Sequence, residues 1–542
     1  MAAASKSSRA GLVLSVLALT QFLMTLDSSV MNVSIRQVAA DVGTTVTGVQ
    51  TAITLYTLVM ASLMITGSKL GSMMGRRRAL AIGLVIYGAG SGLTAAAGNL
   101  PVLIIGWSVL EGIGAALILP SVIALIAGNF PVEQRSRAYG SVAAAGAIAV
   151  AVGPLIGGLV TTMASWRWVF LGEVVLVLVI LPLTRNIADA PAEEKRAFDL
   201  GGALLSTLGL ALVVLGVLKS GEWGWVRPVD GQPQLIGLSP VLWMLLAGLL
   251  VLWLFLERAG HRQEQGKEVL LDPALLKIRQ VSGGLLMFFF EYLIQSGLFF
   301  VVPLFLSVVL QLSALQTGIR ILPLSAALLI SVLVIPRVFP TRSPRAIVRV
   351  GLLLIMAGTV LLIAGIDLDA NASVVALPMI LIGLGIGSLS SQLSAVTVSG
   401  APDEKSNEVG GLQNTATNLG ASLGTALAGA ILIAALSSGL HSGISSSTAI
   451  SADVKAQATT ELSSSVPFVS DAQVTQALSE TSLPASEQQA IIDANRQARI
   501  EALDASLSVV LLFEGLALFF TRRLPNRALS AKNREVADAR SN

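Results

Sequence analysis

Five acidic residues lie inside long apolar runs of this 542-residue sequence: Asp27, Glu111, Glu173, Glu291 and Glu514. A carboxylate at membrane depth is costly unless it is paired, hydrated or protonated. A carboxyl group held away from water also binds a proton more readily than one in water, so it can load and release protons near neutral pH. These acids are therefore the first candidates for carrying protons or pairing with a cationic ligand.

Asp27 stands alone in the apolar run LVLSVLALTQFLMTLDSSVMNVSI, and we expect it to couple protons or substrate to transport. The alternative is a structural carboxylate bonded to Asn32 or to a neighbouring hydroxyl. Glu111 precedes GIGAA, with Ser108 one turn away on nearly the same helix face. No basic partner is evident for Glu111. We therefore predict that Asp27 and Glu111 form a polar pair and take part in proton coupling.

Glu291 lies within LLMFFFEYLIQSG, among aromatic residues. An acid beside aromatic rings suits a lipophilic cation, because the ring faces attract the cation as well. We predict that Glu291 couples protons or binds substrate; the alternative is a packed carboxyl bonded to Gln295. For Glu173 and Glu514 we expect an interfacial or inter-helix role. The predicted substrate-binding residues are Asn32, Glu291, Tyr292, Gln295 and Asn414.

The composition is that of a membrane protein, with 54% hydrophobic and 12% charged residues, against about 25% charged in soluble domains. Cysteine is absent and the two histidines, His261 and His441, fall in predicted loops, which argues against a metal centre. The net charge of +3 is spread between apolar runs and indicates no nucleic-acid surface. No phosphate-binding motif of an ATPase is present. We expect no cofactor and no enzyme activity.

Apolar runs long enough to span a bilayer recur along the chain, since a spanning helix needs about 20 residues. The amino-terminal run lacks a clear cleavage site, so we interpret it as a retained helix. Most Lys and Arg residues fall in alternate loops on the side of the amino terminus, which predicts a plasma-membrane protein with both termini in the cytoplasm. The fourteen predicted spans are 11–35, 48–71, 79–98, 101–127, 138–161, 167–187, 200–219, 235–257, 281–311, 314–336, 347–366, 372–398, 409–437 and 504–522.

An internal sequence repeat suggests two related bundles, because GRRRALAIG at 75–83 is similar to SPRAIVRVG at 343–351. Repeats of this kind place a substrate site at the bundle interface near the membrane midplane. The predicted domains are a six-helix bundle (11–187), two linker helices with a cytoplasmic loop (188–280), a second six-helix bundle (281–522) and a cytoplasmic tail (523–542). Within the second bundle, the external segment 438–503 is expected to be a solvated spacer, with a binding cap as the alternative.

Glycine-rich stretches inside the apolar runs favour close helix contacts. This interpretation applies to Gly153 and Gly157, to Gly420 and Gly424, and to GLGIG at 383–387, which has no strand context for a dinucleotide site. Pro154 can bend its helix and permit rocking. We therefore predict either simple helix packing or a hinge at Gly153, Pro154 and Gly157.

Several stretches resemble the fourteen-helix drug:proton antiporter branch of the major facilitator superfamily. They are LDSSVMNVSI (26–35), AVGPLIGG (151–158), SWRWVFLGEV (165–174), LSALQTGIRILP (312–323) and NTATNLGASLGTAL (414–427). The resemblance spans about residues 11–437 and the final helix, and it implies an all-α major facilitator fold with fourteen helices.

The resemblance also implies a gating role for the matching residues Gly75, Arg76 and Arg77. Simple anchoring of these arginines at the membrane surface is the alternative. The chain departs from the family pattern at Ser72 and Ser108, where an Asp and an Arg are usual, and at Arg36, where a Pro is common.

The sequence thus predicts a monomeric secondary transporter that exports amphipathic or cationic small molecules in exchange for protons by alternating access. Its expected partners are the small molecule, protons and membrane lipids. Two alternatives remain: an exporter of lipid or cell-envelope precursors on the same fold, and a transport-inactive membrane sensor or scaffold.

Overall fold

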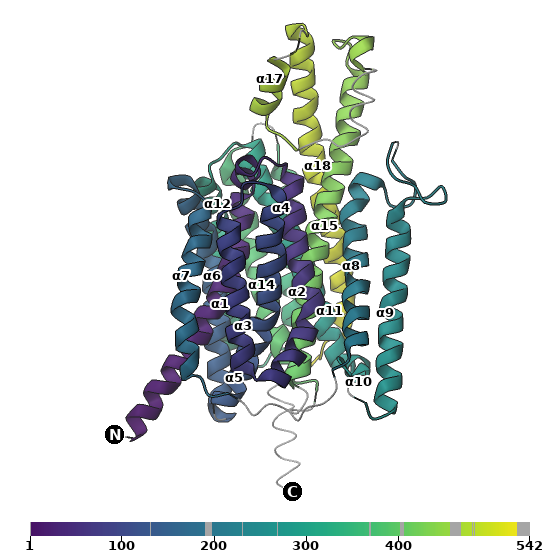
Figure 1. Cartoon of the computed structure of the whole chain (residues 1–542). Helices are drawn as coiled ribbons and strands as arrows, with labels where there is room; N and C mark the ends of the chain where they lie inside the picture. The colour runs from purple at the N-terminus through teal and green to yellow at the C-terminus, as the bar shows by residue number, and fades with distance from the viewer. Residues whose placement is uncertain are drawn as a thin grey trace.

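The computed structural model is a bundle of long helices (Figure 1). It describes residues 2–130, 132–189, 198–229, 231–267, 269–367, 370–401, 406–455, 468–479, 481 and 483–527. Thirteen helices in these ranges are long and apolar enough to cross a membrane; a fourteenth is added if α6, bent by 43° between Val150 and Val152, is one span. The prediction of an all-α, multi-pass membrane protein is confirmed.

The helices of the amino-terminal half are α1 (Ala2–Asp41), α2 (Val46–Met74), α3 (Arg76–Ala95), α4 (Leu100–Leu103), the π-helix η1 (Ile104–Glu111), α5 (Gly112–Asn129), α6 (Val132–Met163), α7 (Arg167–Leu183) and η2 (Thr184–Asn186). The helices α8 (Leu200–Trp223), α9 (Pro240–Glu264) and α10 (Pro273–Lys277) follow. The carboxy-terminal half holds α11 (Arg279–Leu304), the π-helix η3 (Phe305–Val309), α12 (Ala314–Val338), α13 (Pro344–Gly365), η4 (Ala372–Val375), α14 (Ala376–Val398), α15 (Ser406–Ser446), α17 (Asp471–Ser479), α18 (Ala485–Phe520) and η6 (Thr521–Arg523).

Polar capping residues determine where several helices begin. Thr45 accepts a hydrogen bond from the Gly48 N–H at the start of α2. Ser313 and Gln316 form a reciprocal capping box at the start of α12. Such caps satisfy backbone N–H groups that have no partner within the helix. The chain therefore turns at short polar loops between apolar helices.

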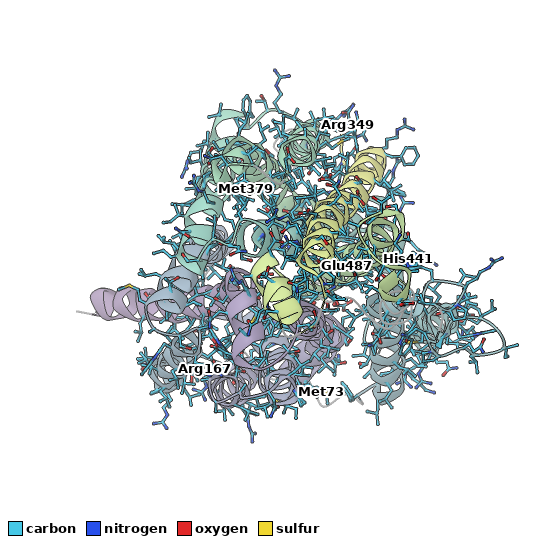
Figure 2. All side chains as sticks on the ribbon, turned by 90° about the horizontal axis from the view of Figure 1, so that it is seen from above. Met73, Arg167, Arg349, Met379, His441 and Glu487 are labelled. Atoms are coloured by element: carbon cyan, nitrogen blue, oxygen red, sulfur yellow. The ribbon has the colours of Figure 1, made fainter. Side chains whose placement is uncertain are left out.

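The two halves lie side by side. Seen from above, Met73 and Arg167 mark the amino-terminal half and Arg349 and Met379 the carboxy-terminal half (Figure 2). Within the first half α1 packs on α6 and α3 packs on α5 and α7; within the second, α12 and α13 pack on α14, and α15 packs on α11 and α18. The pair α8–α9 packs against α2 and α15 through α8. Across the halves, α6 contacts α12 and α2 contacts α15.

Glycines allow the closest helix contacts, as predicted. An added Cβ at Gly383 would lie 2.2 Å from the Leu324 carbonyl oxygen, and one at Gly420 would lie 2.2 Å from that of Phe289. Real Cβ atoms do not approach backbone so closely, so these positions require the smallest residue. The stretch GLGIG is therefore a packing surface of α14 against α12, through Gly383 and Gly387, and against α13, through Gly385.

The segment 438–503 contains helices, and its role as a solvated spacer or a binding cap stays a prediction. The helix α15 continues to Ser446 and α18 already begins at Ala485, so both extend beyond the predicted spans. Together with α17 they project from one end of the bundle (Figure 1). We call this end the α17 end. Residues 456–467, 480 and 482 of the segment lie outside the described residues.

The helix α1 begins and α18 ends at the opposite end of the bundle, which we call the terminal end (Figure 1). This arrangement agrees with a chain that crosses the membrane an even number of times. The predicted tail 523–542 lies outside the described residues from position 528 onward. The division into two six-helix bundles with a linker pair stays a prediction.

Candidate functional site

Three acids from separate helices meet inside the amino-terminal half. They are Asp27 of α1, Glu111 at the end of η1 and Glu173 of α7, which are 0%, 0% and 1% exposed. One oxygen from each carboxyl group lies within 4.8 Å of the other two. We call these residues the acid cluster. The predicted proximity of Asp27 and Glu111 is found, and Glu173 joins them.

Neutral donors surround the acid cluster. The Trp107 Nε1–H donates to Asp27 Oδ1 over 2.8 Å, and Thr94 Oγ1–H donates to Glu111 Oε1 over 3.0 Å. Glu173 Oε2 accepts from Tyr87 OH at 3.0 Å and from Ser91 Oγ at 2.8 Å.

The second oxygens of the three carboxyl groups, Asp27 Oδ2, Glu111 Oε2 and Glu173 Oε1, have no partner among the described residues. Two negative charges within 4.8 Å of each other repel by at least about 3 kcal/mol at an effective dielectric constant of about 20. Positive charge, supplied by protons or by a bound cation, would relieve this repulsion. Oxygen ligands of this kind suit a hard cation as well as protons.

The π-helix η1 shapes this site. It spans Ile104–Glu111 and carries both Trp107 and Glu111. Single π-turns are rare and often occur at functional sites. Gly90 of α3 lets η1 approach, because an added Cβ there would lie 2.8 Å from Glu111 Cγ. Trp107 also stacks on Tyr56 of α2, with ring centroids 5.0 Å apart.

The alternative bond from Asn32 to Asp27 is not found, and Ser108 and Glu111 bond to different helices. Asn32 donates to the Ser28 carbonyl oxygen over 2.8 Å and not to Asp27, whose partner is Trp107. Ser108 donates to the Ala52 carbonyl oxygen over 2.7 Å, toward α2. Because η1 is a π-helix, spacing rules for an α-helix do not place Ser108 beside Glu111.

The halves contact each other closely through α6. Gly153 and Gly157 of α6 pack on Ser29 and Val30 of α1. On α12, an added Cβ at Gly318 would lie 2.2 Å from the carbonyl oxygen of Pro154. The predicted hinge residues thus lie where α6 touches both α1 and the other half.

Buried hydrogen bonds join α2 to α15. Gln50 Nε2–H donates to the Thr425 carbonyl oxygen over 3.0 Å, and Ser422 Oγ–H donates to the Thr54 carbonyl oxygen over 3.0 Å. Gln50 and Thr54 belong to the first turns of α2, on the α17 side. The halves are therefore closed against each other toward the α17 end.

The sequence pattern described as Major Facilitator Superfamily matches residues 17–425. The chain belongs to the major facilitator superfamily. Members of a superfamily share a fold while their substrates differ, so the substrate must be argued from the site.

Relatives of this major facilitator protein include named export and resistance proteins. The tetracenomycin C resistance and export protein of Streptomyces glaucescens is 28% identical, with 73% of this chain and 71% of that protein covered. The puromycin resistance protein of Streptomyces alboniger is 29% identical, with 75% and 78% covered. A multidrug transporter protein of Bacillus subtilis is 25% identical, with 71% and 69% covered. These relatives agree with the resemblance to the drug antiporter branch.

Solved structures confirm the major facilitator fold. An auto-inhibited peptide transporter of the POT family has a TM-score of 0.57 at 15% identity, with 96% of this chain and 97% of that chain covered. A bacterial homolog of the human lysosomal transporter Spinster, in an inward-facing and occupied conformation, has a TM-score of 0.56 at 14% identity, with 95% and 97% covered.

The other predicted acid of this major facilitator protein, Glu291, lies apart from the acid cluster. It is 1% exposed and accepts a hydrogen bond from Ser390 of α14, so the alternative bond to Gln295 is not found. Glu514 of α18 similarly accepts from Thr359 over 2.7 Å. Tyr292 and Gln295 are half-buried on α11.

Asn414 is half-buried and faces a small gap between α15 and the terminal-end parts of α2 and α5, which Ser68 and Arg76 also line. The gap lies between the two halves. Substrate contact at Asn414 stays a prediction.

Asp189 places a carboxylate at the start of α3, next to the loop in which Ser72 replaces the usual family Asp. The sequence did not indicate this residue. Asp189 Oδ1 accepts a hydrogen bond from the Arg77 backbone N–H over 3.0 Å. Gly75 has a φ of +96°, which favours glycine, and an added Cβ there would lie 2.7 Å from Asp189. Ser72 instead donates to the Lys69 carbonyl oxygen. A gating role for Gly75, Arg76 and Arg77 stays a prediction.

The sequence analysis expected an interfacial or inter-helix role for Glu173 and did not place it beside Asp27 and Glu111. It did not indicate the donors Trp107, Tyr87, Ser91 and Thr94. The only sequence signal was the set of polar residues within otherwise apolar spans. It does not show which of them face one another.

Proposed function

We propose that this chain is a proton-coupled exporter of amphipathic or cationic small molecules, located in the plasma membrane with both termini in the cytoplasm. The observation that carries the proposal is the acid cluster: Asp27, Glu111 and Glu173 lie together, buried, without a basic partner among the described contacts. Relatives whose names state antibiotic export or multidrug transport support the small-molecule substrate.

Proton coupling requires a group whose proton affinity differs between two shapes of the protein. In the structure described here the halves are closed at the α17 end, and the acid cluster is enclosed by α1, α3, η1 and α7. Opening at the α17 end would bring water to the cluster and let it bind protons from outside. Closing again and opening at the terminal end would release these protons inside, while the exported molecule moves in the opposite direction.

The substrate contacts are proposed for the space between the halves. A small cavity there is lined by Asn32, Pro154 and apolar residues of α11, including Phe299 and Val302. Glu291 lies on the same helix α11, close to three consecutive phenylalanines. A lipophilic cation gains both charge pairing and ring contact in such surroundings.

The test is transport in proteoliposomes that contain the full chain, with ethidium as the cationic probe and an imposed pH gradient. We expect gradient-driven ethidium movement for the parent and at least a tenfold loss for Asp27→Asn, since one carboxyl group that can carry a proton is removed. Asp41→Asn is the matched control, because Asp41 lies on the same helix but pairs with Arg167 in a partly exposed position.

Two results would reject the proposal. One is transport that does not respond to the pH gradient in the parent; the other is equal transport by the parent and Asp27→Asn. If a sodium gradient at constant pH drives ethidium instead, the acid cluster binds a metal cation and proton coupling is wrong.

A further inference from the structure

A second cavity lies at the α17 end, outside the closed contact between the halves. Its volume is about 690 Å³, and its walls come from α1, the start of α2, the end of α6, the region from η3 to α12 and residues 468–476. Cavities of about 300–1,000 Å³ hold drug-sized ligands. We call it the outer cavity.

The floor of the outer cavity is held by contacts between the halves. Arg36 Nη1–H donates to the Ser307 carbonyl oxygen over 2.7 Å, and the Leu315 backbone N–H donates to Thr162 Oγ1 over 3.0 Å. Asp27 is not among the lining residues. The outer cavity is therefore separate from the acid cluster.

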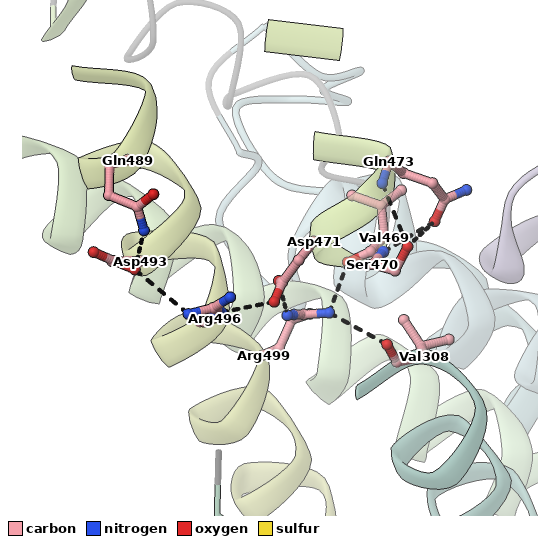
Figure 3. A network of polar contacts seen from close by, with 9 residues as sticks. All are labelled: Val308, Val469, Ser470, Asp471, Gln473, Gln489, Asp493, Arg496 and Arg499. Carbon is pink, nitrogen blue, oxygen red and sulfur yellow. Dashed lines mark hydrogen bonds and ion pairs between the residues drawn. The ribbon is translucent and has the colours of Figure 1, made fainter. Parts of the chain in front are cut away.

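Residues 468–476 cover the outer cavity, and we call them the roof. Side chains of α18 hold the roof in place. Arg499 of α18 is 1% exposed, pairs with Asp471, and donates to the carbonyl oxygens of Val469 at 3.2 Å and Val308 at 3.4 Å (Figure 3). Arg496 binds the other oxygen of Asp471 at 2.6 Å. A guanidinium group leaves water only where such partners replace its hydration. The roof is thus fixed to both α18 and the end of η3.

The lining combines hydrogen-bonding and apolar groups. Five glutamines contribute amide groups: Gln37, Gln311, Gln316, Gln473 and Gln476. Val33, Leu312 and Phe468 supply apolar surface. Arg36 is the one charged side chain among the described lining residues, and it is exposed beyond its bond to Ser307. A guanidinium group with free N–H donors binds a carboxylate well.

We propose that the outer cavity is a second ligand site, which takes an amphipathic molecule with one carboxylate placed next to Arg36. The outer cavity is expected to prefer a negatively charged group, whereas the acid cluster is suited to positive charge. This site goes beyond the proposed proton-coupled export, because its occupancy depends on Arg36 and the roof rather than on Asp27.

The test uses the full chain in lipid nanodiscs and two fluorescent probes: dansylglycine, which carries a carboxylate, and dansylglycinamide, which is its neutral amide. We expect the parent to bind dansylglycine. Ala472→Trp should fill the cavity from the roof and weaken dansylglycine binding by at least tenfold, whereas Ala477→Trp, on the exposed α17 surface outside the lining, should leave binding unchanged.

Arg36→Gln tests the charge. We expect dansylglycine to bind about tenfold more weakly and dansylglycinamide to bind within about twofold of the parent, since only the carboxylate loses its partner. Equal dansylglycine affinity in Ala472→Trp and the parent would overturn the proposal, as would equal weakening of both probes by Arg36→Gln.

Asp27→Asn separates this inference from proton coupling. Unchanged dansylglycine binding in that variant supports the outer cavity whatever happens to transport. Loss of dansylglycine binding in Asp27→Asn would place the probe in the interior and reject the outer site.

Discussion

The indole N–H of Trp107 points at the carboxyl group of Asp27, with 2.8 Å between Nε1 and Oδ1. The same indole ring lies parallel to the ring of Tyr56, at an interplanar angle of 7°. Trp107 therefore links α1 to α2 through the π-helix η1. This contact holds the acid of the first helix at a fixed place relative to Glu111, which ends the same π-helix.

Replacement of this donor tests the contact. Trp107→Phe keeps a ring against Tyr56 but leaves Asp27 Oδ1 without its donor, so we expect a loss of about 1–3 kcal/mol in stability. Transport driven by a pH gradient should fall several-fold. Trp168→Phe is the control, because Trp168 is 61% exposed. Equal melting temperatures and transport rates for the two variants would contradict the role of Trp107.

Glu173 is expected to share the protons of the acid cluster. Glu173→Gln removes one carboxyl group but can still bond to Tyr87 and Ser91, so the fold should persist. We expect the pH dependence of transport to shift, because one of three interacting acids is gone. Glu514→Gln is the matched control, since Glu514 is also buried but contacts Thr359 in the other half. The measurement is transport rate against pH. Identical shifts of this pH dependence in both variants would show that the position of Glu173 in the acid cluster does not matter for proton coupling.

Closure at the α17 end depends on glycine at position 318. Gly318→Ala would place a Cβ 2.2 Å from the Pro154 carbonyl oxygen, so α6 and α12 must separate. We expect transport to be lost while the protein still inserts. Gly411→Ala is the control, since no atom lies within 4 Å of its added Cβ.

The natural absence of cysteine makes this separation measurable. Asn32→Cys places a single thiol beside Pro154 in the small cavity between the halves. A membrane-impermeant maleimide added from the α17 side should label it faster in the Gly318→Ala background. Unchanged labelling would mean that this contact does not seal the α17 end.

Asp189 is expected to stabilise the start of α3. Asp189→Ala removes the acceptor for the Arg77 N–H and should cost about 1 kcal/mol, as losses of helix caps do. Asp189→Asn retains a side-chain oxygen and should stay within a few tenths of a kcal/mol of the parent. Thermal unfolding of the purified protein in detergent is the measurement. A parental melting temperature for Asp189→Ala would show that the bond is dispensable.

The apolar spans could be predicted from the sequence because each one is a local property of about 20 residues. The proximity of Asp27 to Glu111 could also be predicted from the sequence, since both acids stand alone in apolar runs. Glu173 was expected to have an interfacial or inter-helix role and was not placed in the acid cluster, because a helix that is apolar all round gives no sign of which face turns inward. The partner of Asp27 was missed for a related reason: Trp107 lies in the π-helix η1, to which the spacing rules of an α-helix do not apply.

The end of the final domain shows the same limit. The hydropathy pattern predicted that the last two spans are limited to their apolar residues, whereas α15 and α18 continue as helices into the polar segment. Helix propensity of the Ala- and Gln-rich stretch before Asp504 supports this continuation. The anchoring of Asp471 by Arg499 joins residues 28 positions apart and could not be read from either stretch alone.

The unbroken length of α15 has a mechanical consequence. Its 41 residues make a rod about 60 Å long, which runs from the terminal end to beyond the α17 end. A rod of this kind acts as a lever: a tilt of roughly 10° about its middle displaces each tip by about 5 Å. Any rocking of the carboxy-terminal half would therefore move the projecting end of α15 sideways at the α17 end of the bundle (Figure 1).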